Sequence, residues 1–323
     1  MTKVVVIDST GGPEVLLVED QTIGSPGPGE VRIRHTAIGL NFIDTYQRSG
    51  LYPMTMPFVG GNEAAGVVTE VGEGVDYVRV GDRVCYQGVV GAYAEERLLA
   101  ADRVIPIPDG IDDQTAAAIL LKGQTAFYLL FKTWPLQAGE TILWHAAAGG
   151  TGLIATQWAK ALGATVIGTA GSADKLALAK AHGCDYVINY REEDFAARVK
   201  DITGGRGVDV VYDGVGKATF EGSLDCLRPR GLLASFGNAS GPVSVPDLGI
   251  LARKGSLYVT RPTGAHYFPT REERLESATA LFDAVKAGSI KVEIGATFAL
   301  DEVAEAHRAL EARETTGSVV LLP

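Results

Sequence analysis

The chain has little cysteine, fewer basic than acidic residues, and no long apolar run. Its 323 residues include three cysteines, Cys85, Cys184 and Cys226, which are too few and too widely spaced for a disulfide framework or a four-cysteine metal site. A formal charge of -10, with scattered Lys and Arg, argues against nucleic acid as a partner. No apolar run approaches the roughly 20 residues of a membrane span, and the opening MTKVVVIDST lacks the apolar stretch of a signal peptide. We therefore expect a soluble, cytoplasmic protein that binds neither a membrane nor nucleic acid.

The order of strand-like and helix-like segments predicts an α/β protein. The first third contains short strand-like segments, such as VVVID, GVVTEV and DRVCY, separated by turns rich in glycine and proline, which indicates a β-rich unit. From Glu140, apolar strands alternate with helical segments. This alternation is typical of a doubly wound parallel sheet with helices on both faces, and its strands are TILWH, ATVIGT, YVINY, VDVVYD, GLLASF and SLYVT.

The last part of the chain predicts two helices, over residues 271–286 and 301–313, and a strand-like tail, SVVLLP. We expect this tail to return to the β-rich unit. The predicted domains are then a β-rich domain over residues 1–124 and 264–323, and an inserted nucleotide-binding domain over residues 125–263.

The stretch TILWHAAAGGTGLIATQWAKALG predicts a dinucleotide-binding turn. An apolar strand ends at His145, small residues follow, and an amphipathic helix begins at about Gly152. Free N–H groups at such a helix start bind a pyrophosphate when no side chain intervenes. Ala147, Gly149 and Gly152 take the three glycine positions of the G-x-G-x-x-G fingerprint. The alternative is a tight turn of purely structural use. The expected cofactor contacts here are Ala148, Gly149, Gly150, Thr151 and Gly152.

The end of the second parallel strand favours NADPH over NADH. NAD-selective sites usually carry Asp or Glu at this point, where the carboxylate binds the ribose hydroxyls. Here the strand runs into Gly171 and Ser172, and Lys175 follows in the next helix. We expect these three residues, with Tyr190 at the end of YVINY, to bind the 2′-phosphate. The alternatives are that Ser172 is only an N-cap and that Lys175 is solvated, and Asp174 weakens the positive charge.

Several segments in a fixed order resemble one family over essentially the whole chain. They are GLNFIDTYQRSGLYP, GGNEAAGVV, GDRVCY, the phosphate turn, INYREEDF, VYDGVG and RGLLASFGNASGP. Together they resemble the quinone oxidoreductase branch of the medium-chain dehydrogenase/reductase superfamily. The resemblance implies a GroES-like catalytic domain split by an inserted Rossmann domain, and a homodimer.

The resemblance also implies chemistry without a metal. Zinc-dependent members of the superfamily carry Cys and His where this chain has Asn41 and Asn62, and amides are not usual zinc ligands. The expected reaction is hydride transfer from the nicotinamide of NADPH to an electron-poor quinone, with the protein positioning the reactants. The resemblance places Asn41, Tyr46 and Tyr52 at the active-site cleft, where an amide or phenol hydrogen-bonds a quinone oxygen. Turn formation for Asn41 and packing for the two tyrosines are the alternatives.

The remaining candidates follow from the resemblance and from the sheet edge. Thr125 and Tyr128 are similar to residues that face the nicotinamide, with helix packing as the alternative. Further cofactor contacts are expected at the carboxyl ends of the last two strands, from Phe236, Asn238, Ser240 and Arg261. Asp213 is a ribose or turn contact, and we interpret His145 and Cys226 as structural.

Two other functions compete with quinone reduction. The first is an NADPH-dependent enoyl or alkenal reductase, which would share every proposed cofactor residue. The second is a cofactor-binding protein of crystallin or RNA-binding type with little catalysis, although the acidic composition counts against RNA.

Overall fold

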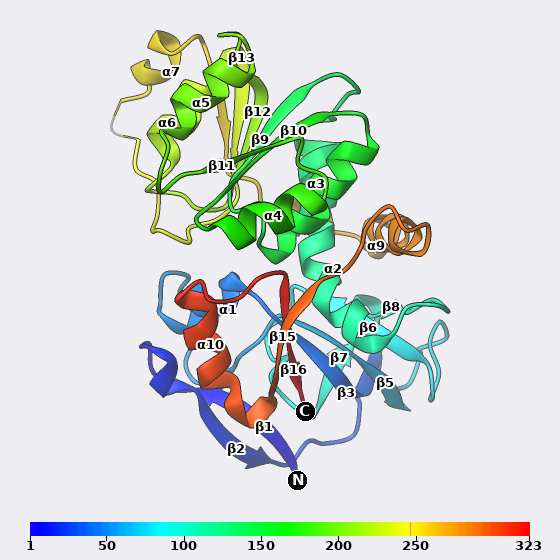
Figure 1. Cartoon of the computed structure of the whole chain (residues 1–323). Helices are drawn as coiled ribbons and strands as arrows, with labels where there is room; N and C mark the ends of the chain where they lie inside the picture. Colours follow the sequence, from blue (N-terminus) through cyan, green and yellow to red (C-terminus); the bar gives the residue numbers. More distant parts are fainter. Residues whose placement is uncertain (246) are drawn as a thin grey trace. The chain divides into compact units, whose positions relative to one another are not determined.

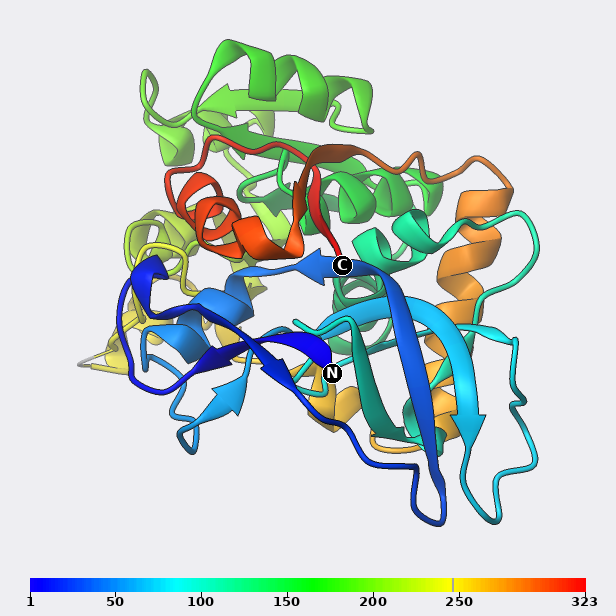
Figure 2. The ribbon, with the colours of Figure 1, turned by 90° about the horizontal axis from the view of Figure 1, so that it is seen from below.

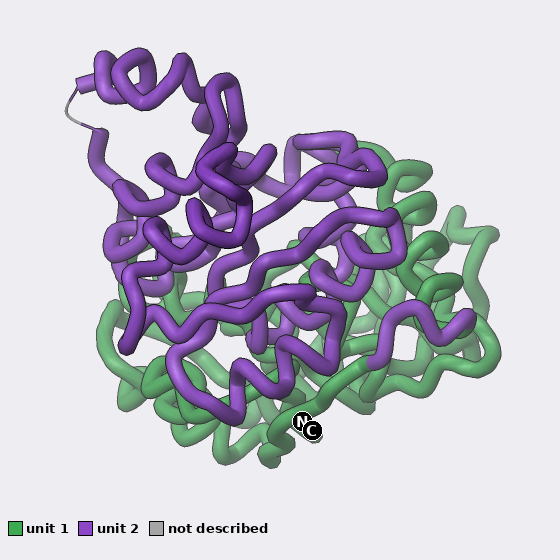
Figure 3. The backbone as a smooth tube through the Cα atoms, turned by 45° about the horizontal axis from the view of Figure 1, so that its top comes forward, with its two compact units in different colours: residues 1–122, 269–286, 292–323 green, residues 123–268, 287–291 purple. Residues whose placement is uncertain are grey.

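The computed structural model describes residues 1–245 and 247–323, which form two compact units. Unit 1 comprises Met1–Lys122, Pro269–Lys286 and Val292–Pro323, and unit 2 comprises Gly123–Phe268 and Ala287–Lys291 (Figure 3). Unit 2 is thus inserted into the sequence of unit 1. The division differs from the predicted boundaries at 124 and 264, and residues 287–291 belong to unit 2. Residues 287–291 join unit 2 because the backbone N–H and C=O of Lys291 both hydrogen-bond the side-chain amide of Gln157.

Unit 1 is built on two sheets. The larger has the order β15-β16-β3-β5-β6-β8, with β7 paired to β3, and the smaller has the order β2-β1-β4. The strand bounds are β1 Thr2–Ile7, β2 Leu17–Gln21, β3 Glu30–Leu40, β4 Phe58–Val59, β5 Glu63–Val71, β6 Arg83–Gln87, β7 Glu96–Ala100, β8 Ile105–Pro106, β15 Ile294–Ala299 and β16 Ser318–Leu322. As expected, the C-terminal tail returns here, since β16 pairs antiparallel with β3 (Figure 2).

Alternating side chains give unit 1 its core. Along β3 the first residues alternate between buried and more exposed positions, as a half-buried strand requires. Val31, Ile33 and Ile38 from this strand join one buried apolar cluster with Val68 of β5 and Val84 of β6. The helices of this unit are α1 Phe42–Arg48, α9 Arg271–Lys286 and α10 Val303–Glu311, and α2 Asp113–Phe127 begins in it and ends in unit 2.

Unit 2 contains a parallel six-stranded sheet of order β11-β10-β9-β12-β13-β14 (Figure 1). Its strands are β9 Thr141–Trp144, β10 Thr165–Ala170, β11 Tyr186–Asn189, β12 Val208–Asp213, β13 Leu227–Ser235 and β14 Tyr258–Thr260. Its helices are α3 Gly150–Ala161, α4 Ala173–Ala181, α5 Phe195–Ile202, α6 Phe220–Cys226, α7 Gly249–Arg253 and α8 Gly264–Tyr267. Chain order reverses between β9 and β12, which is the topology of a doubly wound fold. The predicted parallel sheet is therefore confirmed.

None of the helices within residues 1–245 and 247–323 has the length and apolar character that crossing a bilayer requires.

Candidate active site

The turn between β9 and α3 has a tight backbone geometry. Ala146 adopts a left-handed conformation with φ of 52°. The N–H of Gly149 donates to the carbonyl of Ala146 at 3.0 Å. Helix α3 then begins at Gly150, earlier than the predicted start at about Gly152. The helix starts two residues earlier than predicted because the carbonyl of Gly149 already accepts the N–H of Leu153 at 2.9 Å, although glycine and threonine are weak helix formers.

Glycine at position 152 is required by close packing inside this first helical turn. A Cβ on Gly152 would lie 2.6 Å from the carbonyl oxygen of Ala146 and 2.7 Å from that of Ala147. The N–H groups of Gly150, Thr151 and Gly152 have no acceptor within the helix, because they belong to its first turn. With Ala148 and Gly149 leading into them, they form a turn that fits an anionic pyrophosphate.

The end of β10 brings together the residues predicted to select the phosphate form of the cofactor. Ser172 is the N-cap residue of α4, but its side chain makes no capping hydrogen bond. Lys175 lies in the first turn of the same helix. The hydroxyl oxygen of Tyr190 would be 2.6 Å from a Cβ placed on Gly171, so this phenol lies over the glycine.

Arg191 also lies beside Gly171, and the sequence analysis did not single it out. The Nε atom of Arg191 would be 3.1 Å from a Cβ on Gly171, beside the Tyr190 hydroxyl. A second cation therefore lies where Ser172 and Lys175 were expected to meet the 2′-phosphate. The signal in the sequence is a basic residue directly after Tyr190, but exposed arginines after strands are too common to single out.

The predicted contacts near the nicotinamide have other partners in unit 2. Tyr128 is buried and its ring stacks on Tyr267, with 4.7 Å between ring centroids. Arg261 donates to the backbone carbonyls of Ser235 at 2.8 Å and Gly237 at 3.1 Å. Through these two bonds Arg261 holds the loop that follows β13.

The other candidates around this loop also make structural contacts. Ser240 receives a hydrogen bond from the N–H of Ala218 and donates one to the carbonyl of Val215. The ring of Phe236 lies 5.4 Å from that of Trp144, measured between centroids. Thr125 and Asn238 are half-buried.

Asp213 forms a turn. Its Oδ1 accepts from the N–H groups of Val215 and Gly216, and its Oδ2 accepts from the hydroxyls of Thr219 and Ser223. This carboxylate closes the loop after β12, which favours the turn interpretation over a ribose contact.

His145 and Cys226 have the surroundings of structural residues. The ring nitrogens of His145 contact the hydroxyls of Thr169 and Ser223, both at 3.0 Å. Burial raises the pKa of the Cys226 thiol, so the thiolate that a nucleophile requires is disfavoured.

In unit 1, the residues predicted to be catalytic lie around the start of α1. Asn41 is buried just before the helix, and its backbone N–H donates to Asp44 Oδ2 at 2.8 Å. Its side-chain Nδ2 donates to Glu63 Oε2 at 2.9 Å. The rings of Tyr46 and Tyr52 meet edge to face with 5.3 Å between centroids. The two rings therefore pack against each other.

Amides and carboxylates bind one another around Asn41 and Asn62, the two positions where the resemblance implies zinc ligands in zinc-dependent relatives. Asn62 Nδ2 donates to Asp44 Oδ1 and to Gln47 Oε1, both at 2.7 Å. Glu63 accepts from Asn41 and lies 3.5 Å from the ammonium of Lys122. Burial raises the pKa of Glu63, and Lys122 opposes that rise. In the part of the chain that the structure describes, no three His, Cys, Asp or Glu side chains gather as a metal site.

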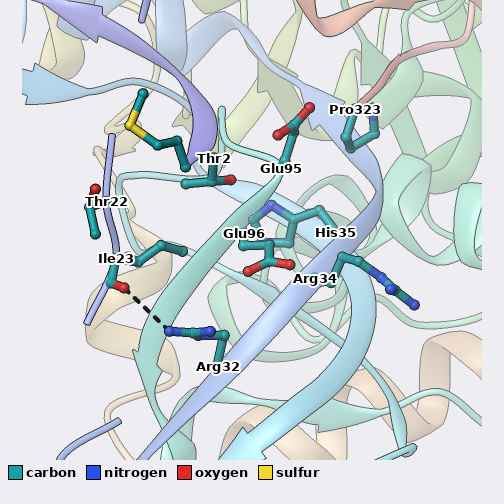
Figure 4. A pocket seen from close by; sticks show the side chains of 10 residues that line it. Thr2, Thr22, Ile23, Arg32, Arg34, His35, Glu95, Glu96 and Pro323 are labelled. Atoms are coloured by element: carbon teal, nitrogen blue, oxygen red, sulfur yellow. Dashed lines mark hydrogen bonds between the residues drawn. The ribbon is translucent and has the colours of Figure 1, made fainter. Parts of the chain in front are cut away.

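A separate cavity of about 520 Å³ lies in unit 1 (Figure 4). None of the predicted site residues lines it. Its walls combine two arginines with two glutamates, and the lining residues are Met1, Thr2, Thr22, Ile23, Arg32, Arg34, His35, Glu95, Glu96 and Pro323. We assign it no part in the reaction.

Comparison with known proteins identifies the family. The alcohol dehydrogenase GroES-like domain family matches residues 27–109, and the zinc-binding dehydrogenase family matches residues 150–280. Quinone oxidoreductase from Pseudomonas aeruginosa is 55% identical over 325 aligned residues, covering 100% of each chain. This chain belongs to the quinone oxidoreductase family. It is therefore an oxidoreductase of the medium-chain dehydrogenase/reductase superfamily, and the predicted GroES-like domain with an inserted Rossmann domain is confirmed.

Two further relatives bear on the chemistry of this family member. The structure of Escherichia coli quinone oxidoreductase complexed with NADPH is 50% identical, with a TM-score of 0.97, and the match covers 99% of this chain and 100% of that one. A 2-haloacrylate reductase from a Burkholderia species is 49% identical, covering 100% of this chain and 99% of its own.

Proposed function

We propose that this protein reduces quinones with hydride from NADPH, without a metal ion. The observation that carries the proposal is the end of β10, which lacks a carboxylate and instead has the Tyr190 phenol and the Arg191 guanidinium over Gly171. This arrangement suits a 2′-phosphate and would leave the ribose hydroxyls of NADH without an acceptor. The full-length likeness to quinone oxidoreductases, including one complexed with NADPH, supports both cofactor and substrate class.

The chain's own residues would bind and orient the reactants. Gly149, Gly150, Thr151 and Gly152 would bind the pyrophosphate, and Ser172, Lys175, Tyr190 and Arg191 the 2′-phosphate. Bound NADPH supplies the hydride. Asn41, Tyr46 and Tyr52 would hydrogen-bond the quinone or the nicotinamide, so that binding energy is used for orientation. Thr125, Tyr128, Phe236, Asn238, Ser240 and Arg261 remain proposed contacts of the nicotinamide half.

The metal-free part of the proposal rests on donor chemistry. Asn41 and Asn62 present amide nitrogens to Glu63 and Asp44, and an amide N–H cannot ligate zinc. Each carboxylate is already occupied by these donors. A quinone is electron-poor enough to accept hydride without a Lewis acid, so the reaction needs no ion here.

A second candidate substrate class is favoured by one relative. The 49% identity to 2-haloacrylate reductase suggests an activated alkene as hydride acceptor. The test measures NADPH oxidation against 1,4-benzoquinone, 9,10-phenanthrenequinone, 2-chloroacrylate and 2-alkenals under the same conditions. The proposal expects the highest kcat/KM with a quinone. The highest value with an alkene would replace it, and no turnover with any acceptor would favour a binding protein.

We also propose a homodimer that forms through the edge of the parallel sheet. Strand β14 is at one end of the strand order, and Tyr258 and Val259 on it are 60% and 37% exposed. An apolar edge strand of this kind favours pairing with the same strand of a second copy.

A further inference from the structure

A buried chain of hydrogen bonds in unit 1 connects the ion pair of Arg48 and Glu311 to the start of α1. Arg48 forms a bidentate pair with Glu311 at 2.7 and 3.0 Å, and its Nη1 lies 3.0 Å from Nδ1 of His307. The Nε2 of His307 lies 3.0 Å from the hydroxyl of Tyr93, which donates to Asp44 Oδ2 at 2.9 Å. We call these four residues the Arg48 relay: Arg48, His307, Tyr93 and Asp44. All are buried.

The direction of every bond in the Arg48 relay is fixed by its first member. A guanidinium has only donors, so Nδ1 of His307 must accept and its proton must be on Nε2. That N–H then donates to the Tyr93 oxygen, and the Tyr93 hydroxyl can donate only to Asp44. Burial lowers the pKa of His307 to about 3, which keeps the ring neutral and consistent with this single tautomer.

The end point of the relay is the carboxylate that holds Asn41. Asp44 Oδ2 accepts from both the Tyr93 hydroxyl and the backbone N–H of Asn41. Burial raises the pKa of Asp44 to about 6, although the hydrogen bonds from Asn62, Asn41 and Tyr93 oppose that rise. Since three donors point at its two oxygens, the group acts as an acceptor. The third donor is the side-chain amide of Asn62, which donates to Asp44 Oδ1.

The GGNE segment makes room for the relay. A Cβ on Gly61 would lie 2.3 Å from Cδ1 of Tyr93, and a Cβ on Gly60 would lie 2.9 Å from its Cδ2. Gly61 also has a left-handed φ of 85°. The two glycines thus allow the Tyr93 ring to pack against the backbone that carries Asn62 and Glu63.

We propose that the Arg48 relay positions Asn41 for the reaction. Asn41 is held at two points, through its backbone by Asp44 and through its side chain by Glu63. The relay keeps Asp44 in place as an acceptor, because reversing any of its bonds would set two donors against each other at Arg48. Arg48, His307, Tyr93 and Asp44 are therefore positioning residues. The inference rests on the proposed function, in which Asn41 contacts the quinone or the cofactor.

The tautomer of His307 tests the relay without any turnover. ¹⁵N-histidine labelling of the full chain gives signals from its five histidines, and the signal missing in His307→Gln identifies His307. The relay expects an unprotonated Nδ1 and a protonated Nε2 between pH 6 and 8. A protonated Nδ1, or a charged ring in that range, would overturn the proposal.

Kinetics test whether the relay acts through Asn41. Tyr93→Phe removes the hydroxyl between His307 and Asp44, and we expect kcat/KM for the quinone to fall about tenfold to a hundredfold, as for a displaced positioning group. In an Asn41→Ala background the same change should alter kcat/KM by less than about twofold, since the residue it positions is gone. Equal effects in both backgrounds would show a general structural role and refute the proposal.

Two further variants serve as matched controls. Tyr86 forms a buried 3.0 Å pair with His35 in the same unit, with no link to Asn41, so Tyr86→Phe should leave kcat/KM within about twofold. His307→Gln retains an acceptor for Arg48 and a donor for Tyr93, and should keep kcat/KM within about threefold, whereas His307→Leu should not. A loss in Tyr86→Phe as large as in Tyr93→Phe would count against the relay.

Quinone turnover by the wild-type protein distinguishes a failure of the proposed function from a failure of the relay. If the wild-type protein turns over no quinone, the proposed function fails. The proposal that the relay positions Asn41 is then tested without turnover. The His307 tautomer is measured as before, and the cycle of Tyr93→Phe and Asn41→Ala is repeated with the dissociation constant of NADPH as its readout. Additive effects on that constant would contradict it.

Discussion

Replacing Gly171 with alanine should weaken NADPH binding and leave NADH binding nearly unchanged. The new Cβ would lie 2.6 Å from the hydroxyl oxygen and 2.9 Å from Cζ of Tyr190, and 3.1 Å from Nε of Arg191. These atoms are on side chains that can move, so the overlap is relieved without distorting β10. The phenol and the guanidinium then leave the position where we propose that the 2′-phosphate binds.

The size of the effect follows from the contacts that are lost. A hydrogen bond to a charged group contributes about 1.5–3 kcal/mol, so losing one raises the Kd of NADPH about tenfold to a hundredfold. Gly171→Asp should go further, because its carboxylate repels the phosphate and accepts from a ribose hydroxyl, which shifts preference toward NADH. Lys175→Ala and Arg191→Ala should weaken NADPH in the same way, and Tyr190→Phe less.

Fluorescence titration with NADPH and with NADH measures both constants on the same sample. NADH is the internal control, because it lacks only the 2′-phosphate. Circular dichroism confirms that each variant is folded. If Gly171→Ala weakens both cofactors equally, the glycine serves general packing, and if NADPH binding is unchanged, Tyr190 and Arg191 do not contact the phosphate. Either result refutes the reasoning.

Three further predictions address metal, pH and assembly. Exhaustive chelation should leave quinone turnover unchanged, whereas stoichiometric zinc lost together with activity would overturn the metal-free proposal. Burial lowers the pKa of His35 to about 4 from 6.5, so the unfolded chain binds a proton that the folded one does not, and stability falls as the pH drops below 6.5. Urea unfolding measures the free energy of unfolding at pH 7.5 and at pH 5. Between these two pH values, His35→Gln should lose about 2 kcal/mol less of that free energy than the wild type does. Equal losses would contradict this origin of the acid sensitivity. Tyr258→Asp on the β14 edge should convert dimers to monomers in light scattering, and a stable dimer in that variant would exclude this interface.

The fold was largely predictable because its signals are local. The strands of unit 2 are short apolar runs bounded by glycine and polar residues, and each run became a strand of the parallel sheet. The helix over Arg271–Lys286 was also predicted with its correct bounds. The boundary near residue 287 was not predictable, because it depends on Lys291 pairing with Gln157, which is far away in sequence.

The candidate site was predictable only where its chemistry lies in one segment. The turn from Ala146 to Gly152 carries its own signature of small residues before a helix. The surroundings of Asn41 do not, because nothing near it in the sequence points to its partner Glu63, or to the Tyr93 and His307 that lie behind Asp44. A buried tyrosine and a buried histidine resemble ordinary core residues until the fold places them within hydrogen-bond distance. Arg191 was missed for the opposite reason, since exposed arginines are frequent.

The two asparagines at the zinc-ligand positions make sense once the neighbouring carboxylates are considered. Asp44 and Glu63 are buried, and an uncompensated buried charge is strongly destabilising, by several kcal/mol. In this chain Asn62 donates to Asp44 and Asn41 donates to Glu63, so each amide satisfies one carboxylate. A side chain without an N–H donor at either position would leave a buried carboxylate short of a partner. The same amides that make a poor zinc site therefore stabilise the carboxylates beside them, and those carboxylates in turn fix the orientation of Asn41.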